Sequence, residues 1–240
     1  MTANPLTTAI LLAAGEGSRL RPSAPFKPLC RVAGKALIDH ALDGLATAGL
    51  TRCVVVLGYG EAAIREHLAL RARRGSGTPE IVVVTTDHAH PNGVSALAAA
   101  PVVDSSGAVL AMCDHLVDPA LYRRMAEAGP GPGLRLGIDR RLGHAWVDPL
   151  DVTCVRTRGQ RIEAIGKELV DHDAYDTGVF AVGPALFDAL SALPDPSLSD
   201  GVRVLAAEGR AEIVDVSDLE WLDVDDPPAL ARAEAWRAAA

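Results

Sequence analysis

Lysine is scarce in this chain. Of 23 basic side chains in 240 residues, only Lys27, Lys35 and Lys167 are lysines, and the rest are arginines. Arginine presents a planar fork, whereas lysine places a compact ammonium on a flexible stem. A chain that uses arginine for general surface charge keeps lysine where that compact charge matters, so Lys27 and Lys167 are candidate functional residues. Lys35 opens a helical pattern, and we interpret it as a solvated residue.

Paired cysteines and long apolar runs are also absent. The four cysteines, Cys30, Cys53, Cys113 and Cys154, form no CxxC pair, which excludes a zinc site and a disulfide framework of the usual spacing. No basic segment precedes an apolar core near residue 1, and no apolar run is long enough to cross a bilayer. We therefore expect a soluble, cytoplasmic protein with free buried thiols and no membrane insertion.

Excess positive charge is missing as well. The formal net charge is -8 and the sequence pI is about 5.3, so a nucleic-acid partner is not expected. RARRGSGTP, residues 71–79, is the one dense basic run. It ends a helical pattern, where cations favour the helix dipole, and then breaks into glycine, serine and proline. We interpret it as a solvated loop.

The most informative stretch is ILLAAGEGSRLRPSAPFKPL, residues 10–29. An apolar strand pattern leads into Gly15 and Gly17, followed by Arg19 and Lys27. The glycines let backbone N–H groups approach a bound anion, and the two cations supply fixed positive charge. The pattern predicts a loop that handles phosphate. The alternative is an ordinary strand-to-helix turn with two incidental basic residues.

Two common glycine-rich motifs do not fit this stretch. A P-loop needs glycine, four residues and then Gly-Lys-Ser/Thr, and no such string follows Ala14. A dinucleotide-binding fingerprint needs a third glycine where Leu20 stands. Both motifs are excluded.

Strand and helix patterns alternate through the first half. Strands are expected at 9–13, 53–57, 81–85 and 109–113, with helices near 36–48, 60–72 and 94–100. This order predicts an α/β fold, a Rossmann-like, doubly wound and mostly parallel sheet. Ligands of such sheets bind beyond the carboxyl ends of the strands, where the glycine-rich loop falls.

The pattern changes after GPGPG, residues 129–133. LRLGID, VTCVRT, QRIEAIG and TGVFAV read as strands with short connections, and Arg158-Gly159 suits a hairpin turn. We expect an antiparallel platform that supplies the second wall of a cleft. Helices at 184–190 and 199–208, strands in AEIVDV and EWLDV, and a closing helix at 225–240 follow. The whole chain is predicted to be one domain, 1–240, with a nucleotide-binding half, 1–128, and an acceptor-binding half, 134–240.

Carboxylates that could hold a metal occur at two places. Asp114 follows the strand pattern VLAMC, so it should point into the cleft, and Asp223 and Asp225 lie in EWLDVDD. Magnesium takes one or two carboxylates together with phosphates and water. The alternatives are that Asp114 caps a turn and that Asp225 or Asp226 caps the last helix.

Histidine gives weaker signals. His88 and His90 form a His-x-His in a polar loop with no further ligand at a recognisable spacing, so we interpret them as loop residues. His115 either positions substrate or is a hydrogen-bonded turn histidine. No Ser/His/Asp order stands out.

The glycine-rich stretch resembles the signature LAAGxGxRLxP followed by KP of nucleotidyltransferases that couple a nucleoside triphosphate to a phosphorylated acceptor. The resemblance implies that the loop wraps the triphosphate and that Arg19 and Lys27 act on its phosphates as catalytic residues. The loop residues so implied are Leu12, Ala13, Ala14, Gly15, Glu16 and Gly17.

Further segments extend the resemblance over nearly the whole chain. CDHLVDPALYRRM, VDPLDVTCVRTRGQRIEAIGKELVDHDAYDTGVFAV and WLDVDDPPAL resemble the inositol-1-phosphate cytidylyltransferase branch, which makes CDP-inositol from CTP. The branch implies Mg²⁺ held by Asp114 and Asp223, with Asp225 close by. Cys113 stands where the branch usually has glycine, a small residue for a small one.

The same branch implies an acceptor site. Its IGK lysine falls on Lys167, which would bind the acceptor phosphate, and its DTG loop falls on Asp176, Thr177 and Gly178, which would hold acceptor hydroxyls. His115 is placed with this group. Some members of the branch are fused to a membrane-embedded transferase.

The nucleobase is expected against TTDHAHPNGVSALAA. Asn92 and Ser95 offer amide and hydroxyl groups to a base edge, and Gly93 permits close approach.

We therefore expect an Mg²⁺-dependent cytidylyltransferase acting on CTP, or another NTP, and inositol-1-phosphate or a similar phosphorylated polyol. A sugar-1-phosphate, phosphocholine or a phosphonate is the alternative acceptor. A module of another class would sense nucleotide without turnover, and loss of Arg19, Lys27 or the aspartates would have signalled it. The sequence leaves a homodimer open.

Overall fold

A nine-stranded mixed sheet runs through the molecule in the computed structural model, which describes residues 4–75 and 79–239. The strand order is β5-β4-β1-β6-β11-β8-β12-β10-β9. The strands are β1 (Thr8–Ala13), β4 (Arg52–Leu57), β5 (Glu80–Thr85), β6 (Ala108–Met112), β8 (Leu134–Asp139), β9 (Cys154–Arg158), β10 (Arg161–Gly166), β11 (Ala174–Val182) and β12 (Ala211–Asp215).

The first half is the expected parallel sheet. β5, β4, β1 and β6 run in one direction, with Leu11 of β1 opposite Val55 of β4 and Ala111 of β6. All six residues of β1 are buried, because helices cover both faces. The glycine-rich loop leaves the carboxyl end of this central strand.

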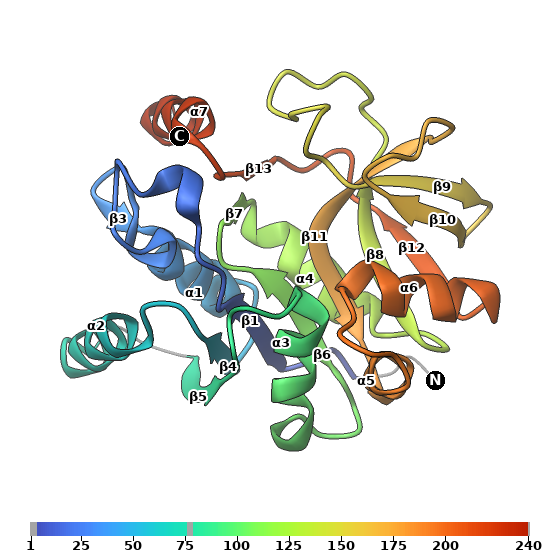
Figure 1. The fold of residues 1–240 in the computed structure, drawn as a ribbon, viewed down its shortest axis with the longest axis horizontal. Coiled ribbons are helices and arrows are strands. Elements are labelled where there is room, and N and C mark those ends of the chain that lie inside the picture. Colours follow the sequence, from blue (N-terminus) through green and yellow to red (C-terminus); the bar gives the residue numbers. More distant parts are fainter. Residues whose placement is uncertain (1–3, 76–78, 240) are drawn as a thin grey trace.

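Helices cover the sheet in two layers (Figure 1). Leu11 faces a core shared with α1, α2 and α4, whereas its neighbours Ile10 and Leu12 face a core shared with α3, α5 and α6. The alternation of side chains along a strand explains how one apolar run serves both layers. The helices are α1 (Leu37–Thr47), α2 (Glu61–Arg73), α3 (Asn92–Ala99), α4 (Pro119–Ala128), α5 (Pro184–Ser191) and α6 (Leu198–Ala207).

The second half is mainly antiparallel. β11 runs antiparallel to both β6 and β8, and β9 and β10 form the hairpin expected at Arg158-Gly159. β12 departs from this pattern and lies parallel to β8, because α5 and α6 return the chain to the end of the sheet where β8 starts. β9 also pairs with β11, so five strands of this half close into a ring.

Within the described residues, two short ribbons lie outside the main sheet. The sequence patterns did not indicate three of their four strands, whereas the fourth, at 221–223, falls in the strand expected in EWLDV. β2 (Arg31–Val32) pairs with β3 (Lys35–Ala36), and β7 (His115–Val117) pairs with β13 (Trp221–Asp223). In the second ribbon Asp223 lies opposite His115. This register brings residues more than a hundred positions apart to one place.

The closing helix α7 (Pro227–Ala239) is confirmed, and Asp226 caps it by accepting a hydrogen bond of 2.7 Å from the Ala229 N–H. A third apolar cluster packs α7 against β2 and the β7–β13 ribbon through Val32, Leu116, Leu222 and Ala233. α7 therefore covers the segments that carry the candidate site.

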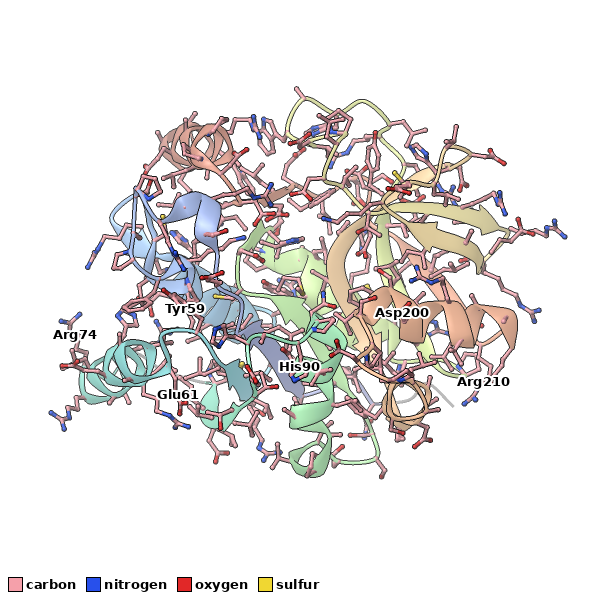
Figure 2. All side chains as sticks on the ribbon, viewed as in Figure 1. Tyr59, Glu61, Arg74, His90, Asp200 and Arg210 are labelled. Atoms are coloured by element: carbon pink, nitrogen blue, oxygen red, sulfur yellow. The ribbon has the colours of Figure 1, made fainter. Side chains whose placement is uncertain are left out.

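The basic run lies at the periphery. α2 ends at Arg73, as expected, and Arg74 sits at its exposed end, across the molecule from Arg210 (Figure 2). Residues 76–78 of this run lie outside the described residues. Lys35 is half-exposed and pairs with Asp43. Within 4–75 and 79–239, none of the helices combines the length and apolarity required to cross a membrane.

Candidate functional site

Two adjoining cavities open beyond the carboxyl ends of β1 and β6. The loop cavity, of about 270 Å³, is lined by the glycine-rich loop, Lys27 and Pro28. The platform cavity, of about 230 Å³, is lined by residues from the second half, including Lys167, Asp176 and Gly178. Arg19, Asp114 and Asp225 line both cavities and therefore mark the boundary between them.

Gly17 shapes the loop cavity. Its backbone has φ +58°, in the left-handed region that favours glycine, and a Cβ there would lie 2.3 Å from the Cβ of Lys27. Any side chain at position 17 would displace Lys27. The glycine thus fixes where the lysine enters the cavity.

Lys27 is a nearly buried cation between two carboxylates. Its side chain is 9% exposed, and its Nζ lies 2.6 Å from Asp114 Oδ2 and in contact with Asp225 Oδ1. Burial alone would lower the pKa of Lys27, but the charge of Asp114 and Asp223 raises it above its ordinary value. The ammonium group is therefore charged at neutral pH and oriented for an anion.

Asp114, His115 and Asp223 form a group that could hold a metal ion, with one ligand atom from each residue and all within 4.8 Å of one another. Asp114 Oδ1 and Asp223 Oδ1 are buried and have no hydrogen-bond partner among the described residues. Unpaired buried carboxylate oxygens are costly unless a cation satisfies them. The two carboxylates of this group therefore fit a hard cation, which prefers oxygen ligands.

Asp225, which the sequence placed among the metal ligands, lies outside this group. One of its oxygens contacts Lys27 and the other lies 2.6 Å from Arg19 Nη2. It does not cap α7 either, since Asp226 does so. Asp225 thus pairs with both Arg19 and Lys27 of the glycine-rich stretch.

His115 is fixed by the DTG segment. Its Nδ1–H donates to the Thr177 carbonyl at 2.8 Å, and its Nε2 lies 3.6 Å from Asp223 Oδ2. Gly178 has φ +73°, and a Cβ there would lie 2.5 Å from the imidazole. Burial alone would lower the pKa of His115, but Asp223, Asp114 and the Thr177 carbonyl raise it to about 9.

The other two DTG residues differ in position: Asp176 lines the cavity, and Thr177 lies behind its wall. Asp176 lines the platform cavity, and its burial raises its pKa to about 6. Thr177 is fully buried, and its hydroxyl donates to the Gly137 carbonyl at 2.8 Å. Its side chain thus supports the wall from behind, which differs from the expected contact with acceptor hydroxyls.

Lys167 reaches the site from the turn after β10. Its Nζ contacts Asp151 Oδ1, and the other Asp151 oxygen lies 2.6 Å from Arg19 Nη2. The structure thus brings together the predicted acceptor lysine and the predicted triphosphate arginine through a carboxylate to which the sequence assigned no role.

Only some of the loop residues that were predicted to bind the nucleotide line the cavities. Leu12, Ala13, Gly15 and Gly17 line the loop cavity, whereas Ala14 is buried behind it and the Glu16 carboxylate pairs with Arg21.

The expected base-binding residues have other contacts. Asn92 lines the platform cavity, and its Oδ1 accepts from the Leu198 N–H at 2.8 Å. A Cβ on Gly93 would lie 2.4 Å from the Pro196 carbonyl, and Ser95 is buried. Gly93 therefore serves packing of α3 on the segment before α6, and base contacts of these residues stay a prediction.

A family model described as the MobA-like NTP transferase domain matches residues 9–210. The chain belongs to that family. The match covers the chain from β1 to α6 and ends before β12, β13 and α7, so Asp223 and Asp225 of the cavity lining lie beyond it.

Curated relatives cover this NTP transferase domain over most of its length. The chain is 35% identical over 231 residues to a bifunctional IPC transferase and DIPP synthase of Rubrobacter xylanophilus, covering 94% of this chain and 51% of that protein. It is 31% identical to a CMP-5'-(3-aminopropyl)phosphonate synthase of Streptomyces rubellomurinus, covering 91% of this chain and 37% of that one. The domain thus spans about half or less of the length of these relatives.

The fold matches that of solved structures. An inositol-1-phosphate CTP transferase from T. maritima superposes with a TM-score of 0.84 at 23% identity, covering 97% of this chain and 96% of that one. A glucose-1-phosphate thymidylyltransferase-like structure from Bacillus anthracis gives a TM-score of 0.82 at 18% identity, covering 95% and 94%. These likenesses confirm the predicted fold class.

Sequence reasoning missed the loop of residues 140–153, which supplies Trp146, Asp148 and Asp151 to the platform cavity. Its acidic residues in VDPLD, just before β9, were the available signal. They carry no periodicity, so nothing in the pattern indicated that Asp151 lies beside Arg19, which is 132 positions away in the sequence.

Proposed function

We propose that this domain is a cytidylyltransferase that joins CTP and inositol-1-phosphate into CDP-inositol and releases pyrophosphate. One observation carries the proposal. A cavity built on the nucleotidyltransferase loop, with Arg19 and Lys27 in its lining, adjoins a second cavity with its own lysine, and Arg19, Asp114 and Asp225 lie at the boundary. Two substrates that each bring phosphate can meet there.

The reaction would proceed by attack of an acceptor phosphate oxygen on the α-phosphorus of CTP. A new P–O bond forms, and the bond to the β-phosphate breaks as pyrophosphate leaves with its electron pair. The acceptor phosphate is already ionised near neutral pH, so orientation matters more than a general base. That requirement agrees with a site in which Arg19, Lys27 and Lys167 can orient the phosphates of two substrates.

Each charged residue has a role in this scheme. Lys27 and Arg19 would neutralise the triphosphate, and Lys167 would hold the acceptor phosphate. Asp114 and Asp223 would hold Mg²⁺, since their unpaired oxygens need a cation. When bound, the ion would lower the cost of charge that builds up on the α-phosphate oxygens. His115 would keep Asp223 in place, because it faces both carboxylates.

Support for CTP and inositol-1-phosphate comes from the sequence motifs and from the relatives' names. A second candidate acceptor is a phosphonate, because the Streptomyces rubellomurinus relative aligns with 91% of the chain. Both acceptors present a phosphorus oxyanion to the same lysine. The walls of the platform cavity must distinguish them.

The test is an activity panel. The protein is incubated with each of the four NTPs and with inositol-1-phosphate, glucose-1-phosphate, phosphocholine or 3-aminopropylphosphonate, with Mg²⁺ or with EDTA. Pyrophosphate release is followed, and each NTP alone is the control for hydrolysis. We expect release with CTP and inositol-1-phosphate in Mg²⁺ and none in EDTA. Absence of release with every pair would favour a nucleotide-sensing module instead.

A further inference from the structure

Asp151 joins the two cavities electrostatically. It lies on the 140–153 loop, and its two carboxylate oxygens bind two cations from distant parts of the chain, Arg19 and Lys167. Arg19 lines both cavities, and Lys167 lines the platform cavity. Charges of opposite sign then alternate through the site in the order Asp114, Lys27, Asp225, Arg19, Asp151 and Lys167.

The three cations of this series differ in accessibility. The Lys27 side chain is 9% exposed, whereas Arg19 is 51% and Lys167 59% exposed. Ion pairs of exposed side chains are weak, since water competes for both charges. The pairs of Asp151 can therefore open at little cost, while Lys27 stays where it is.

Asp151 also has the chemistry of a phosphate substitute. Hydrogen bonds from Lys167 and Arg19 lower its pKa, so it is an anion at neutral pH. A carboxylate offers its two oxygens to a guanidinium and an ammonium as a phosphate would. If the substrate phosphates bind these two cations more strongly than Asp151 does, Asp151 holds the cations only in the substrate-free domain.

We propose that Asp151 is an internal competitor of the substrate phosphates: its carboxylate holds Arg19 and Lys167 in the empty domain and is displaced when phosphate binds. This inference rests on the proposed function and deepens it, since it concerns the phosphate subsites of the same reaction. Asp151 acts on substrate binding through the two cations that it touches.

The competition couples the two substrates. One carboxylate serves two cations, so a triphosphate that takes Arg19 leaves Asp151 held by Lys167 alone. The acceptor phosphate then displaces a carboxylate bound on one side only. Nucleotide binding should therefore tighten acceptor binding, and the acceptor should tighten nucleotide binding by the same factor.

Calorimetric titration with inorganic phosphate tests the competition without requiring turnover. We expect Asp151→Asn to bind phosphate about tenfold more tightly than the unmodified domain, because a competing anion and its two weak ion pairs are removed. Asp218→Asn is the matched control, because it also removes one carboxylate that pairs with an arginine. Asp218 is exposed, pairs with Arg124 and lines neither cavity, so the phosphate affinity of this variant should stay within about twofold of the unmodified domain.

Equal or weaker phosphate binding by Asp151→Asn would overturn the inference and show that Asp151 preorganises the two cations. Circular dichroism establishes that the variants are folded, and Asp151→Ser provides the same test should the asparagine variant not fold. In turnover assays, the acceptor KM of Asp151→Asn should fall while kcat stays within about twofold. The dependence of that KM on CTP concentration should also disappear.

The two proposals can fail separately. Tighter phosphate binding by Asp151→Asn without pyrophosphate release from any substrate pair would overturn the proposed function and retain the competitor. Normal turnover with unchanged phosphate affinity would overturn the competitor alone.

Discussion

At the scale of single residues, Lys27 shows how burial and charge together fix the position of an ammonium group. Its ammonium group lies between Asp114 and Asp225, and Gly17 leaves room for its stem. A charge with so little exposure keeps its orientation before substrate arrives, so no reorganisation is needed in the transition state. The structure thus gives a physical reason for the retention of lysine here in a chain that otherwise uses arginine.

Lys27→Ala should lower kcat by about 10²-fold or more, which is the usual effect of removing one preorganised charge. The measurement is pyrophosphate release at saturating CTP, with circular dichroism to show that the variant is folded. Lys35→Ala is the control, because Lys35 pairs only with the half-exposed Asp43 among the described contacts. A folded Lys27→Ala variant with turnover within a few-fold of the unmodified enzyme would contradict the role of Lys27.

Much of the residue-level site could be predicted because it lies in one continuous motif. Gly15, Gly17, Arg19 and Lys27 are close in sequence, and the loop carries them to one cavity. Asp151 could not be predicted, since its role depends on a contact across 132 positions. Thr177 was recognised in its motif, but the direction of its side chain is set by the Gly137 carbonyl on a neighbouring strand.

At the scale of elements, the β7–β13 ribbon determines where the candidate metal group of Asp114, His115 and Asp223 forms. Its register sets Asp223 opposite His115, and the ribbon is tied to the main sheet by Asp139. Asp139 is fully buried at the end of β8, accepts from the Trp221 indole N–H at 2.8 Å and pairs with Arg141. One carboxylate thereby anchors β13 beside β8.

Asp139→Asn should destabilise the domain by about 2 to 3 kcal/mol at pH 7, because it removes a buried charge partner of Arg141 and the Trp221 N–H. Urea unfolding measures the loss. Asp218→Asn, at an exposed pair with Arg124, should change stability far less because water screens it.

The effect of Asp139→Asn on stability should depend on pH. Burial alone would raise the pKa of Asp139, but Arg141 and Trp221 lower it below its ordinary value of 3.8. A lowered folded-state pKa means that the contribution is complete above pH 3.8 and is lost as pH falls through the folded-state pKa. The difference in unfolding free energy between the unmodified domain and Asp139→Asn should shrink below about pH 4. A constant difference down to pH 2 would argue against an ionic role of Asp139.

At the scale of the whole molecule, the continuous sheet joins two kinds of pairing. The parallel strands could be predicted from alternating apolar runs and helices, and the hairpin from its turn. The parallel placement of β12 beside β8 and the return of β9 onto β11 could not, because they depend on which strands become neighbours. Sequence patterns indicate elements, whereas their order in a sheet follows from packing.

Because residues from both halves line the cavities, ligand binding should stabilise the entire domain. CTP with Mg²⁺ at about 100 times its Kd should raise Tm by about 5 to 10 °C, since binding to the folded state alone adds about 2.7 kcal/mol. Differential scanning fluorimetry measures the shift. Asp223→Asn should reduce the shift, and EDTA should reduce it in the unmodified domain to the level of that variant. An equal shift with EDTA would count against the metal.

The contacts of Lys27 and Asp114 have a consequence for biosynthesis. Both residues belong to the first half of the chain, yet Asp223 and Asp225, their partners in the metal group and the ion pairs, are added near its C-terminal end. When the strands of the parallel sheet have been synthesised, Lys27 and Asp114 therefore still lack their partners Asp225 and Asp223. The nascent chain can pair its parallel strands early, but Asp114, His115 and Asp223 come together only when the β7–β13 ribbon closes.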